Sequence, residues 1–286
     1  ATWSGDDATT QNITNDGNSD LQPDLVWVKC RNTGGNGFDH TVWDTSRGVD
    51  NNVNKSLSPS QDDYEGLGDN VSTTAQYGGV SAMLSDGFTV REGSIDNDSR
   101  YVNENSRTYV GWQWKANGGT TVSVSASGNG TDADTTKAGT YQANTTAGFS
   151  IVTFSTGSIS NGDHRINHGL GAVPHFIMPK SRDSAGDWYI YHHKGTDDND
   201  YFRINKSNAS SNAGARNTFD GSDFTSTYFE MDYNNILLQN ENYVAYCWTS
   251  IQGYSKFGSY TGNGDADGPF VYTGFKPAWI MQKNTA

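Results

Sequence analysis

Short apolar runs that follow a proline recur three times along the chain. The copies read PDLVWVK (23–29), PHFIMPK (174–180) and PAWIMQK (277–283), each with one spacer, three apolar residues, one variable position and a lysine. Proline fixes φ and cannot donate to a ladder, so it suits the residue just before a strand. The β-branched and aromatic run behind it is typical of a buried strand. The pattern predicts one repeated strand, and therefore one repeated structural unit.

Two further segments recur in the first two copies. HTVWDTSRG (40–48) and DWYIYHHKG (187–195) follow the proline strands, and we predict that each is the second strand of a hairpin. This alignment makes Arg47 and Lys194 equivalent. NENSRTYVGWQW (103–114) and NENYVAYCW (240–248) share Asn-Glu-Asn and end in a tryptophan, which predicts a second pair of equivalent strands.

The distances between copies give the domain organisation. Gly148 and Gly253 lie 105 residues apart, and Pro174 and Pro277 lie 103 apart, which fits one small β domain better than a solenoid rung. We expect a first repeat over 1–116 that begins one strand late, with Trp3-Ser4-Gly5 aligned to Phe154-Ser155 and to Tyr260-Thr261-Gly262. A Gly/Ser/Thr-rich linker or extended arm follows over 117–147, then a complete repeat over 148–252. Residues 253–286 begin a third, truncated repeat, so we expect the natural chain to continue.

The predicted fold class is all-β: tandem antiparallel β-sandwich domains, jelly-roll-like, with long loops. Composition agrees, because glycine is frequent (33 of 286), charged residues make up only 18% and aromatic residues 12%. Such a chain has many turns but enough aromatic side chains for compact cores. The net charge of −13 argues against a nucleic-acid partner. No apolar run approaches the roughly 20 residues of a membrane helix, so no membrane insertion is expected.

Histidines offer little support for a metal or catalytic site. His164 and His168 are four apart, a spacing that suits ligands on a helix, but they flank a glycine turn with no glutamate between them. His192 and His193 are neighbours in a predicted strand, so they point to opposite faces. We expect no catalytic residue, no cofactor and no metal.

Acidic runs occur at 96–98, 132–134, 197–200 and 265–267. Calcium takes six to eight oxygen ligands, which such runs can supply, and the run 197–200 is the best calcium candidate. None of the runs has the twelve-residue loop with a closing glutamate. We therefore interpret them as solvated turns.

Tryptophans and cysteines are interpreted mainly as core residues. Trp112 and Trp114 share one face of a strand, and only Trp112 is free to stack on a sugar, because Trp114 aligns with Trp248. Trp43 and Trp188 lie near equivalent positions, which favours packing. Cys30 and Cys247 occupy non-equivalent positions and are expected to be buried thiols; a disulfide is the alternative.

Several motifs in consistent order resemble repeat domains of tail-fibre and other virion structural proteins of tailed bacteriophages, particularly marine ones. They are SDGFTV…YVGWQWKANGG, GFSIVTF…HGLGAVPHFIMPK and GYSKFGSYTGNGDADGPFVYTGFKPAW. The resemblance covers most of 1–116 and 148–286. It departs where the first copy has the shorter DLQP in place of HGLGAVP, and where YVGWQW lacks the cysteine of YVAYCW.

The resemblance implies a modular β-rich appendage of the virion, usually a homotrimer, without enzymatic activity and with no catalytic residues to transfer. Its receptor-binding residues are unknown, because such contacts vary too much to be placed by motif. The expected function is a tail or side fibre that acts as a spacer and, through loops at the domain ends, binds a bacterial surface glycan. Its partners would be itself and other virion proteins. The alternatives are a capsid-surface decoration fibre, a secreted carbohydrate-binding module or a polysaccharide depolymerase.

Overall fold

The computed structural model describes residues 1–18, 20–32, 38–49, 55–66, 77–94, 98–128, 135–159, 162–195, 200–208, 211–212, 218–219, 223–233 and 236–285. All regular structure in these ranges is β-strand, and they contain no helix, which confirms the predicted all-β class. The strands in the described ranges are β1 (Thr2–Ser4), β2 (Thr10–Ile13), β3 (Leu25–Cys30), β4 (Thr41–Asp44), β5 (Gly79–Leu84), β6 (Gly87–Arg91), β7 (Thr108–Trp114), β8 (Val122–Val124), β9 (Thr135–Thr136), β10 (Gly139–Asn144), β11 (Phe149–Ser155), β12 (Asp163–Asn167), β13 (Phe176–Ser181), β14 (Tyr189–His192), β15 (Asp200–Arg203), β16 (Ser211–Asn212), β17 (Tyr228–Asp232) and β18 (Asn242–Trp248).

The chain divides into two compact units. The first comprises Ala1–Thr121 and Ser181–Trp188, and the second comprises Val122–Lys180 and Tyr189–Ala286. In the part of the chain that the structure describes, no helix is long and apolar enough to cross a membrane.

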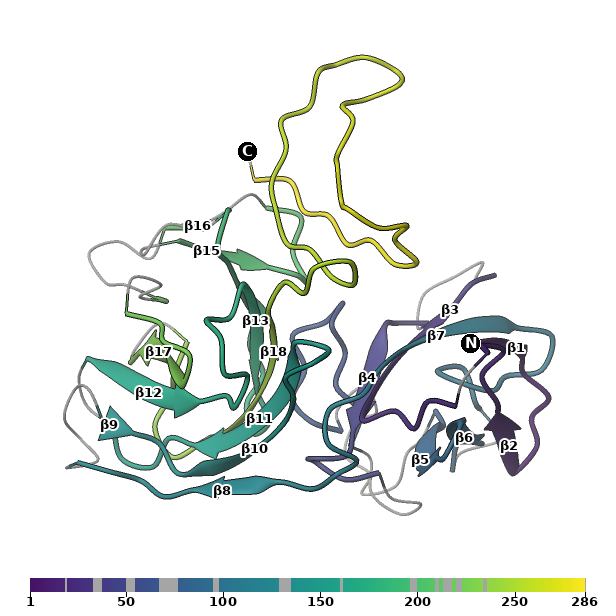
Figure 1. Ribbon diagram of the computed structural model, residues 1–286. Coiled ribbons are helices and arrows are strands. Elements are labelled where there is room, and N and C mark those ends of the chain that lie inside the picture. The colour runs from purple at the N-terminus through teal and green to yellow at the C-terminus, as the bar shows by residue number, and fades with distance from the viewer. Residues whose placement is uncertain are drawn as a thin grey trace. The chain divides into compact units, whose positions relative to one another are not determined.

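The first unit is a sandwich of two antiparallel sheets. One sheet has the strand order β1-β7-β3-β4 and the other β2-β6-β5 (Figure 1). Buried side chains from both sheets form one core, among them Val26 of β3, Phe88 of β6 and Tyr109 of β7. The alternation along β3 places Val26 and Val28 in this core, as expected for a strand with one face toward a second sheet.

The second unit repeats this plan with added strands. Its large sheet has the order β16-β15-β14-β13-β18-β11-β10-β8, and the smaller sheet has the order β17-β12-β9. Phe154 of β11, Ile177 of β13, Phe229 of β17 and Tyr243 of β18 meet in its core. In the smaller sheet β12 pairs antiparallel with β17 and, over two residues, parallel with β9.

The two units share one strand order around the strand that comes last in each. In the first unit β7 lies between β1 and β3, and in the second β18 lies between β11 and β13. The registers agree, because Trp3 faces Tyr109 and Phe154 faces Tyr243. The backbone bond next to each proline also recurs: Asp24 N donates to Trp114 O and His175 N to Trp248 O, both at 2.8 Å. The proline strands β3 and β13 each form a hairpin with the next strand, β4 and β14, as predicted.

The segment 117–147 differs from the predicted linker or arm. It supplies β8, β9 and β10, and β10 pairs with β11 from Gly139–Phe154 to Asn144–Phe149. Gly139 permits this close pairing, because a Cβ at this position would lie 2.1 Å from Thr153 O. The segment 117–147 has a low-complexity composition that did not predict β10, a largely polar strand in which Gln142 is fully buried.

Three predicted equivalences shift by a few residues. The register pairs Val26 with Trp43 and Ile177 with Tyr191, so the counterpart of Trp43 is Tyr191, three residues after Trp188. On the same register Asp44 corresponds to His192, which shifts Arg47 by one position relative to Lys194. The alignment of the last strands through Tyr109 and Tyr243 also places the two Asn-Glu-Asn triplets three residues apart.

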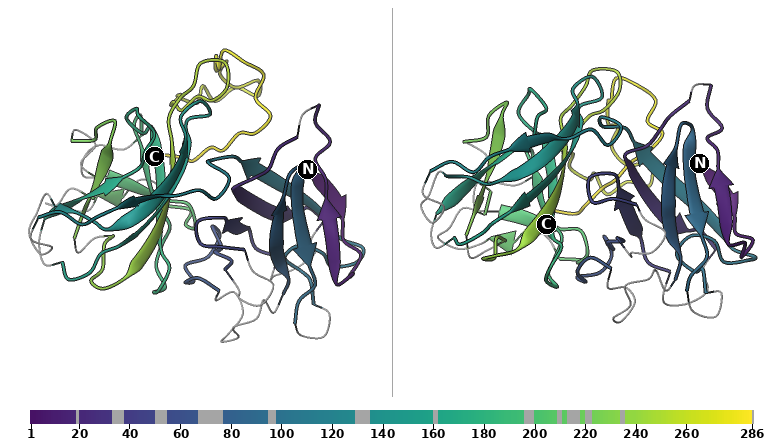
Figure 2. Two further views of the ribbon diagram at one scale, coloured as in Figure 1. Left: turned by 60° about the horizontal axis from the view of Figure 1, so that its bottom comes forward. Right: turned by 90° about the horizontal axis from the view of Figure 1, so that it is seen from below.

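The third copy of the proline motif forms no strand in the described residues 256–285. Figure 2 shows this C-terminal segment in yellow as a long loop without arrows. Several of its large apolar side chains are exposed, including Phe270 at 90% and Ile280 at 72%.

Candidate functional site

His164 and His168 have separate structural partners, whereas the rings of His192 and His193 lie 5.5 Å apart. His164 is buried in β12, where its Nδ1 lies 3.2 Å from Thr135 Oγ1. His168 follows β12 and is also buried; its Nδ1 accepts from Leu170 N and its Nε2 faces Thr225 O. Positions four apart along extended chain are about 13 Å apart, too far to share one ion.

Burial makes these histidines unusually hard to protonate. It lowers the pKa of His164 to about 4, with help from the nearby charge of Lys137, and that of His168 to about 4 despite its bond to Thr225 O. Neutral His168 is required by its geometry, since its Nδ1 accepts a backbone N–H. These side chains therefore act as neutral hydrogen-bonding groups at neutral pH.

The acidic runs fall largely outside the described residues. Asp96, the run 132–134 and residues 197–199 lie outside them, and Asp98 and Asp200 lie inside. Asp98 forms an ion pair with Arg100, and the exposed turn at 265–267 is closed by a bond from Gly268 N to Asp265 O. Among the described residues, no group of three or more His, Cys, Asp or Glu side chains could hold a metal ion.

The tryptophans and cysteines are mostly buried. Trp43 and Trp248 belong to the interiors of their units, and Trp188 is fully buried with its Nε1 donating to Ser58 O. Trp112 and Trp114 are half-buried, and Trp112 stacks against His40. Cys30 and Cys247 are buried thiols that form no disulfide, which confirms the first interpretation.

A tyrosine hydroxyl closes the turn before the last strand in both units. Tyr109 Oη accepts from Glu104 N at 3.0 Å and donates to Arg100 O. Tyr243 Oη accepts from Leu238 N at 2.9 Å and donates to Ile236 O. Both turns contain a non-glycine residue with positive φ, Ser106 at 64° and Asn240 at 56°, three positions before the tyrosine.

Burial raises the pKa of both tyrosines. The phenols therefore stay protonated and can donate at neutral pH. Sequence reasoning missed this pair because it aligned the neighbouring Asn-Glu-Asn triplets. The usable signal was the Tyr-Val dipeptide, which is in register in both units.

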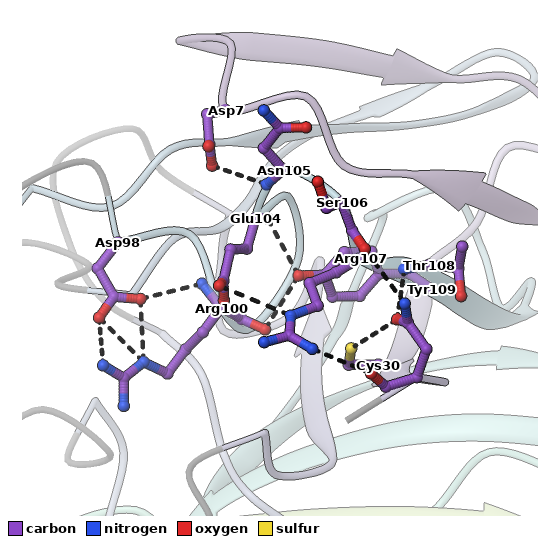
Figure 3. A network of polar contacts seen from close by, with 11 residues as sticks. Asp7, Cys30, Asp98, Arg100, Glu104, Asn105, Ser106, Arg107, Thr108 and Tyr109 are labelled. Atoms are coloured by element: carbon purple, nitrogen blue, oxygen red, sulfur yellow. Dashed lines mark hydrogen bonds and ion pairs between the residues drawn. The ribbon is translucent and has the colours of Figure 1, made fainter. Parts of the chain in front are cut away.

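The turn at 104–107 in the first unit presents polar side chains and is braced, that is, fixed by hydrogen bonds from neighbouring segments (Figure 3). Asn32 fixes the backbone on one side of this turn, since its Oδ1 accepts from Thr108 N and its Nδ2 donates to Ser106 O. Asp7 Oδ1 accepts from Asn105 N on the other side. Asn105 and Ser106 are exposed on this scaffold.

Charged groups flank this surface. The guanidinium of Arg107 lies 3.6 Å from Glu104 Oε1. The guanidinium of Arg100, paired with Asp98, lies over the ring of Tyr77 at 4.2 Å. Fixed donors and acceptors of this kind suit the recognition of a polar ligand, because little ordering is needed on binding. They offer no nucleophile paired with a base.

The residue after each proline forms a second recurring contact. Asp24 is fully buried, and its Oδ2 accepts from Ala116 N at 2.7 Å and from Gly118 N. His175 takes its place in the second unit, where Nδ1 accepts from Ser250 N at 2.8 Å. Each side chain therefore accepts a hydrogen bond from a backbone amide just after the last strand and fixes the backbone there.

A buried ionic cluster stabilises the loop after β4. Arg47 is fully buried and pairs with Asp44, and its guanidinium lies 3.5 Å from Glu65 Oε1. Glu65 also accepts from Arg182 Nε at 2.6 Å. Arg47 also donates to the backbone carbonyls of Lys55 and Val42, so we assign the cluster a structural role.

Comparison with known proteins gives one family. The family described as "Domain of unknown function (DUF7483)" matches residues 1–286. No curated protein and no solved structure matches the chain.

Proposed function

We propose that this chain, which belongs over its whole length to this family of domains of unknown function, is a structural segment of a bacteriophage virion. In this proposal it is part of a tail or side fibre. The observation that carries the proposal is the repetition of one sandwich plan in tandem. Small cores joined head to tail are a simple way to build a long appendage, because each unit folds around its own hydrophobic interior.

The sheet edges support assembly into a homotrimer. β8 forms one edge of the large sheet in the second unit and is largely exposed, although its three residues limit the backbone groups that it offers. Open edges carry unpaired backbone groups that other chains can pair with. A threefold bundle would cover such edges and exclude uncontrolled association.

The braced turn at 104–107 supports a contact with the host surface. Asn105 and Ser106 are exposed polar side chains on a scaffold fixed by Asp7, Asn32 and Tyr109. Surface glycans are recognised through such hydroxyl and amide groups. Display on a trimer would let weak single contacts add to useful avidity.

The test of the fibre is the oligomeric state of the chain. Light scattering should give a mass of about 93 kDa, three times the 31.1 kDa chain, and unboiled gels should show a band that collapses on boiling. A monomer at all concentrations would contradict the trimer. The same monomer with saturable sugar binding would favour a secreted carbohydrate-binding module, and release of reducing ends from a polysaccharide would favour a depolymerase.

A further inference from the structure

Three histidines gather at the open end of the hairpin formed by β13 and β14. His175 directly precedes β13, His192 is the last residue of β14, and His193 follows it. The ring centroids of His175 and His193 lie 4.1 Å apart, and those of His192 and His193 lie 5.5 Å apart. A backbone bond from His193 N to His175 O fixes the closer pair across the hairpin.

This pair contacts the chain where it leaves β18, over residues 249–257, which we call the exit segment. His175 Nδ1 accepts from Ser250 N at 2.8 Å. His193 Nε2 lies 3.2 Å from Phe257 O, and because a carbonyl only accepts, the ring donates there. Each ring of the pair therefore holds a different part of the exit segment.

The exit segment is ordered by further contacts within the second unit. The ring of Phe257 stacks on Phe176 at 5.7 Å and lies 6.4 Å from that of His192. Ile251 and Ser255 exchange backbone bonds in both directions, at 3.0 and 2.9 Å. These bonded amides make the order of the exit segment measurable by hydrogen exchange.

The hydrogen bonds determine which ring nitrogen carries the proton. His175 Nδ1 accepts from Ser250 N, and His192 Nδ1 accepts from Lys194 N at 3.1 Å, so both neutral rings are protonated at Nε2. Neither ring then has a lone pair left for a metal ion, since a ligating histidine donates through its other nitrogen. A charged His175 would instead direct an N–H at the N–H of Ser250.

The surroundings of the pair oppose a positive charge. Burial lowers the pKa of His175, with help from His193 and Lys194, and burial lowers the pKa of His193, again with help from Lys194. The exit segment contains no carboxylate, and the ammonium of its one lysine, Lys256, donates to Tyr272 O. A group whose pKa is lower in the fold loses stabilisation as pH falls below its unfolded value of about 6.5.

The other histidines titrate at lower pH. Burial is the largest cause in each case, and it lowers the pKa to about 4 for His40, His164, His168 and His192. Between pH 7 and pH 5 an acid response that arises from histidine therefore points to the pair.

We propose that His175 and His193 form an acid-sensitive clasp, which holds the exit segment at neutral pH and releases it between pH 7 and pH 5. A proton on either ring places a charge beside the other, and a proton on His175 also removes the acceptor of Ser250 N. The exit segment then loses its order while β18 keeps its place between β11 and β13. The inference does not depend on the virion proposal.

The test is hydrogen exchange of the full chain at pH 7 and pH 5, corrected for the intrinsic effect of pH on exchange. Protection of the amides at 250–257 should fall by at least about 10-fold at pH 5, whereas that of 243–248 in β18 should stay within about twofold. Equal protection of 250–257 at the two pH values overturns the clasp. A parallel loss at 243–248 also overturns it, because the whole unit would then be unfolding.

A double variant, His175→Asn with His193→Gln, assigns the response to the pair. Its side-chain amides can still accept from Ser250 N and donate to Phe257 O, but they do not titrate, so protection at 250–257 should be equal at pH 7 and pH 5. His192→Gln is the matched control and should keep the full response. A response that persists in the double variant, or disappears in the control, contradicts the assignment. The measurements on the unmodified chain test the release without either variant.

Discussion

Tyr109 and Tyr243 each connect two backbone groups that no strand satisfies. A buried backbone N–H or C=O without a partner costs free energy, so a phenol that accepts one and donates to another stabilises a turn that the ladder does not reach. The residue at positive φ beside it, Ser106 or Asn240, marks where the chain reverses. This side-chain contact therefore belongs to the plan that the two units share.

Tyr243→Phe should lower the free energy of unfolding of the second unit by about 1–3 kcal/mol, because Leu238 N and Ile236 O lose their partner. Tyr254→Phe removes a hydroxyl from a side chain that is 59% exposed and should change stability by less than about 0.5 kcal/mol. Denaturant unfolding of the two variants measures the difference. Equal effects would show that the buried hydroxyl does not hold the turn.

His175 should make the exit from β18 sensitive to acid. Burial and the neighbouring His193 and Lys194 lower its pKa, so it is neutral at pH 7 and its Nδ1 accepts from Ser250 N. A group whose pKa is lower in the fold than in the unfolded chain loses stabilisation as pH falls below its ordinary value of about 6.5. Protonated Nδ1 would donate, and the Ser250 amide would lose its acceptor.

The first unit supplies the matched variant, since Asp24 occupies the equivalent position. In His175→Asp the carboxylate should keep accepting from Ser250 N between pH 7 and 5, so the protection factor of that amide should fall less than in the unmodified chain. Burial and the neighbouring His193 lower the pKa of His192 to about 4, below this pH range, so the comparison reports on position 175 and on the adjacent His193. An identical pH profile in the two proteins would contradict this role.

At the scale of elements, Gly169 and Gly171 show how the turn before the second proline strand is packed. Both have a φ of +70°, but a Cβ at Gly169 would lie 2.2 Å from the ring of Tyr141 in β10, whereas the nearest atom to one at Gly171 is 4.0 Å away. Tyr141 itself packs against the core of the second unit. The packing of β10, which carries Tyr141, therefore requires a glycine at position 169.

Each glycine replaced by alanine should cost about 1–2 kcal/mol for the left-handed backbone. Gly169→Ala should cost about 1–3 kcal/mol more, because the ring of Tyr141 must move within a packed interior. Thermal or denaturant unfolding of the two variants gives the comparison. Gly171→Ala as damaging as Gly169→Ala would argue against the packing of β10 on this turn.

The sequence was sufficient to predict the proline strands, their hairpins and the all-β class. Pro23 and Pro174 each precede a buried apolar run that forms a strand, whereas the same pattern after Pro277 forms none, so the pattern indicates a strand only where the run finds a pairing partner. The strand at 139–144 was not predictable in the same way. Its buried position belongs to Gln142, whose polar side chain gives no hydrophobic alternation, and its partner β11 determines its conformation.

The functional contacts were harder to predict because they depend on register. Asp24 and His175 are chemically unlike, so nothing in the sequence indicates that they accept a backbone amide at the same place. The Asn-Glu-Asn triplets look alike but differ by three positions once the tyrosines are superimposed on one register. The shared Tyr-Val dipeptide and the pairing of the last strands show which residues correspond.

At the scale of the whole chain, each unit is organised around the strand that its sequence supplies last. β7 or β18 pairs with both the first strand and the proline strand of its unit, so it joins the first strand to the hairpin that the proline strand forms. The described residues 256–285 form no strand, and Phe270, Tyr272 and Ile280 are exposed there.

Hydrogen exchange over the full chain tests most directly whether each unit is organised around its last strand. We expect Tyr109–Trp114 and Tyr243–Trp248 to contain the slowest-exchanging amides of their units, because these strands are paired on both sides, and residues 258–285 to exchange near the rate of an unstructured peptide. Last strands that exchange as fast as the edge strands, or strand-like protection across 258–285, would contradict the shared plan.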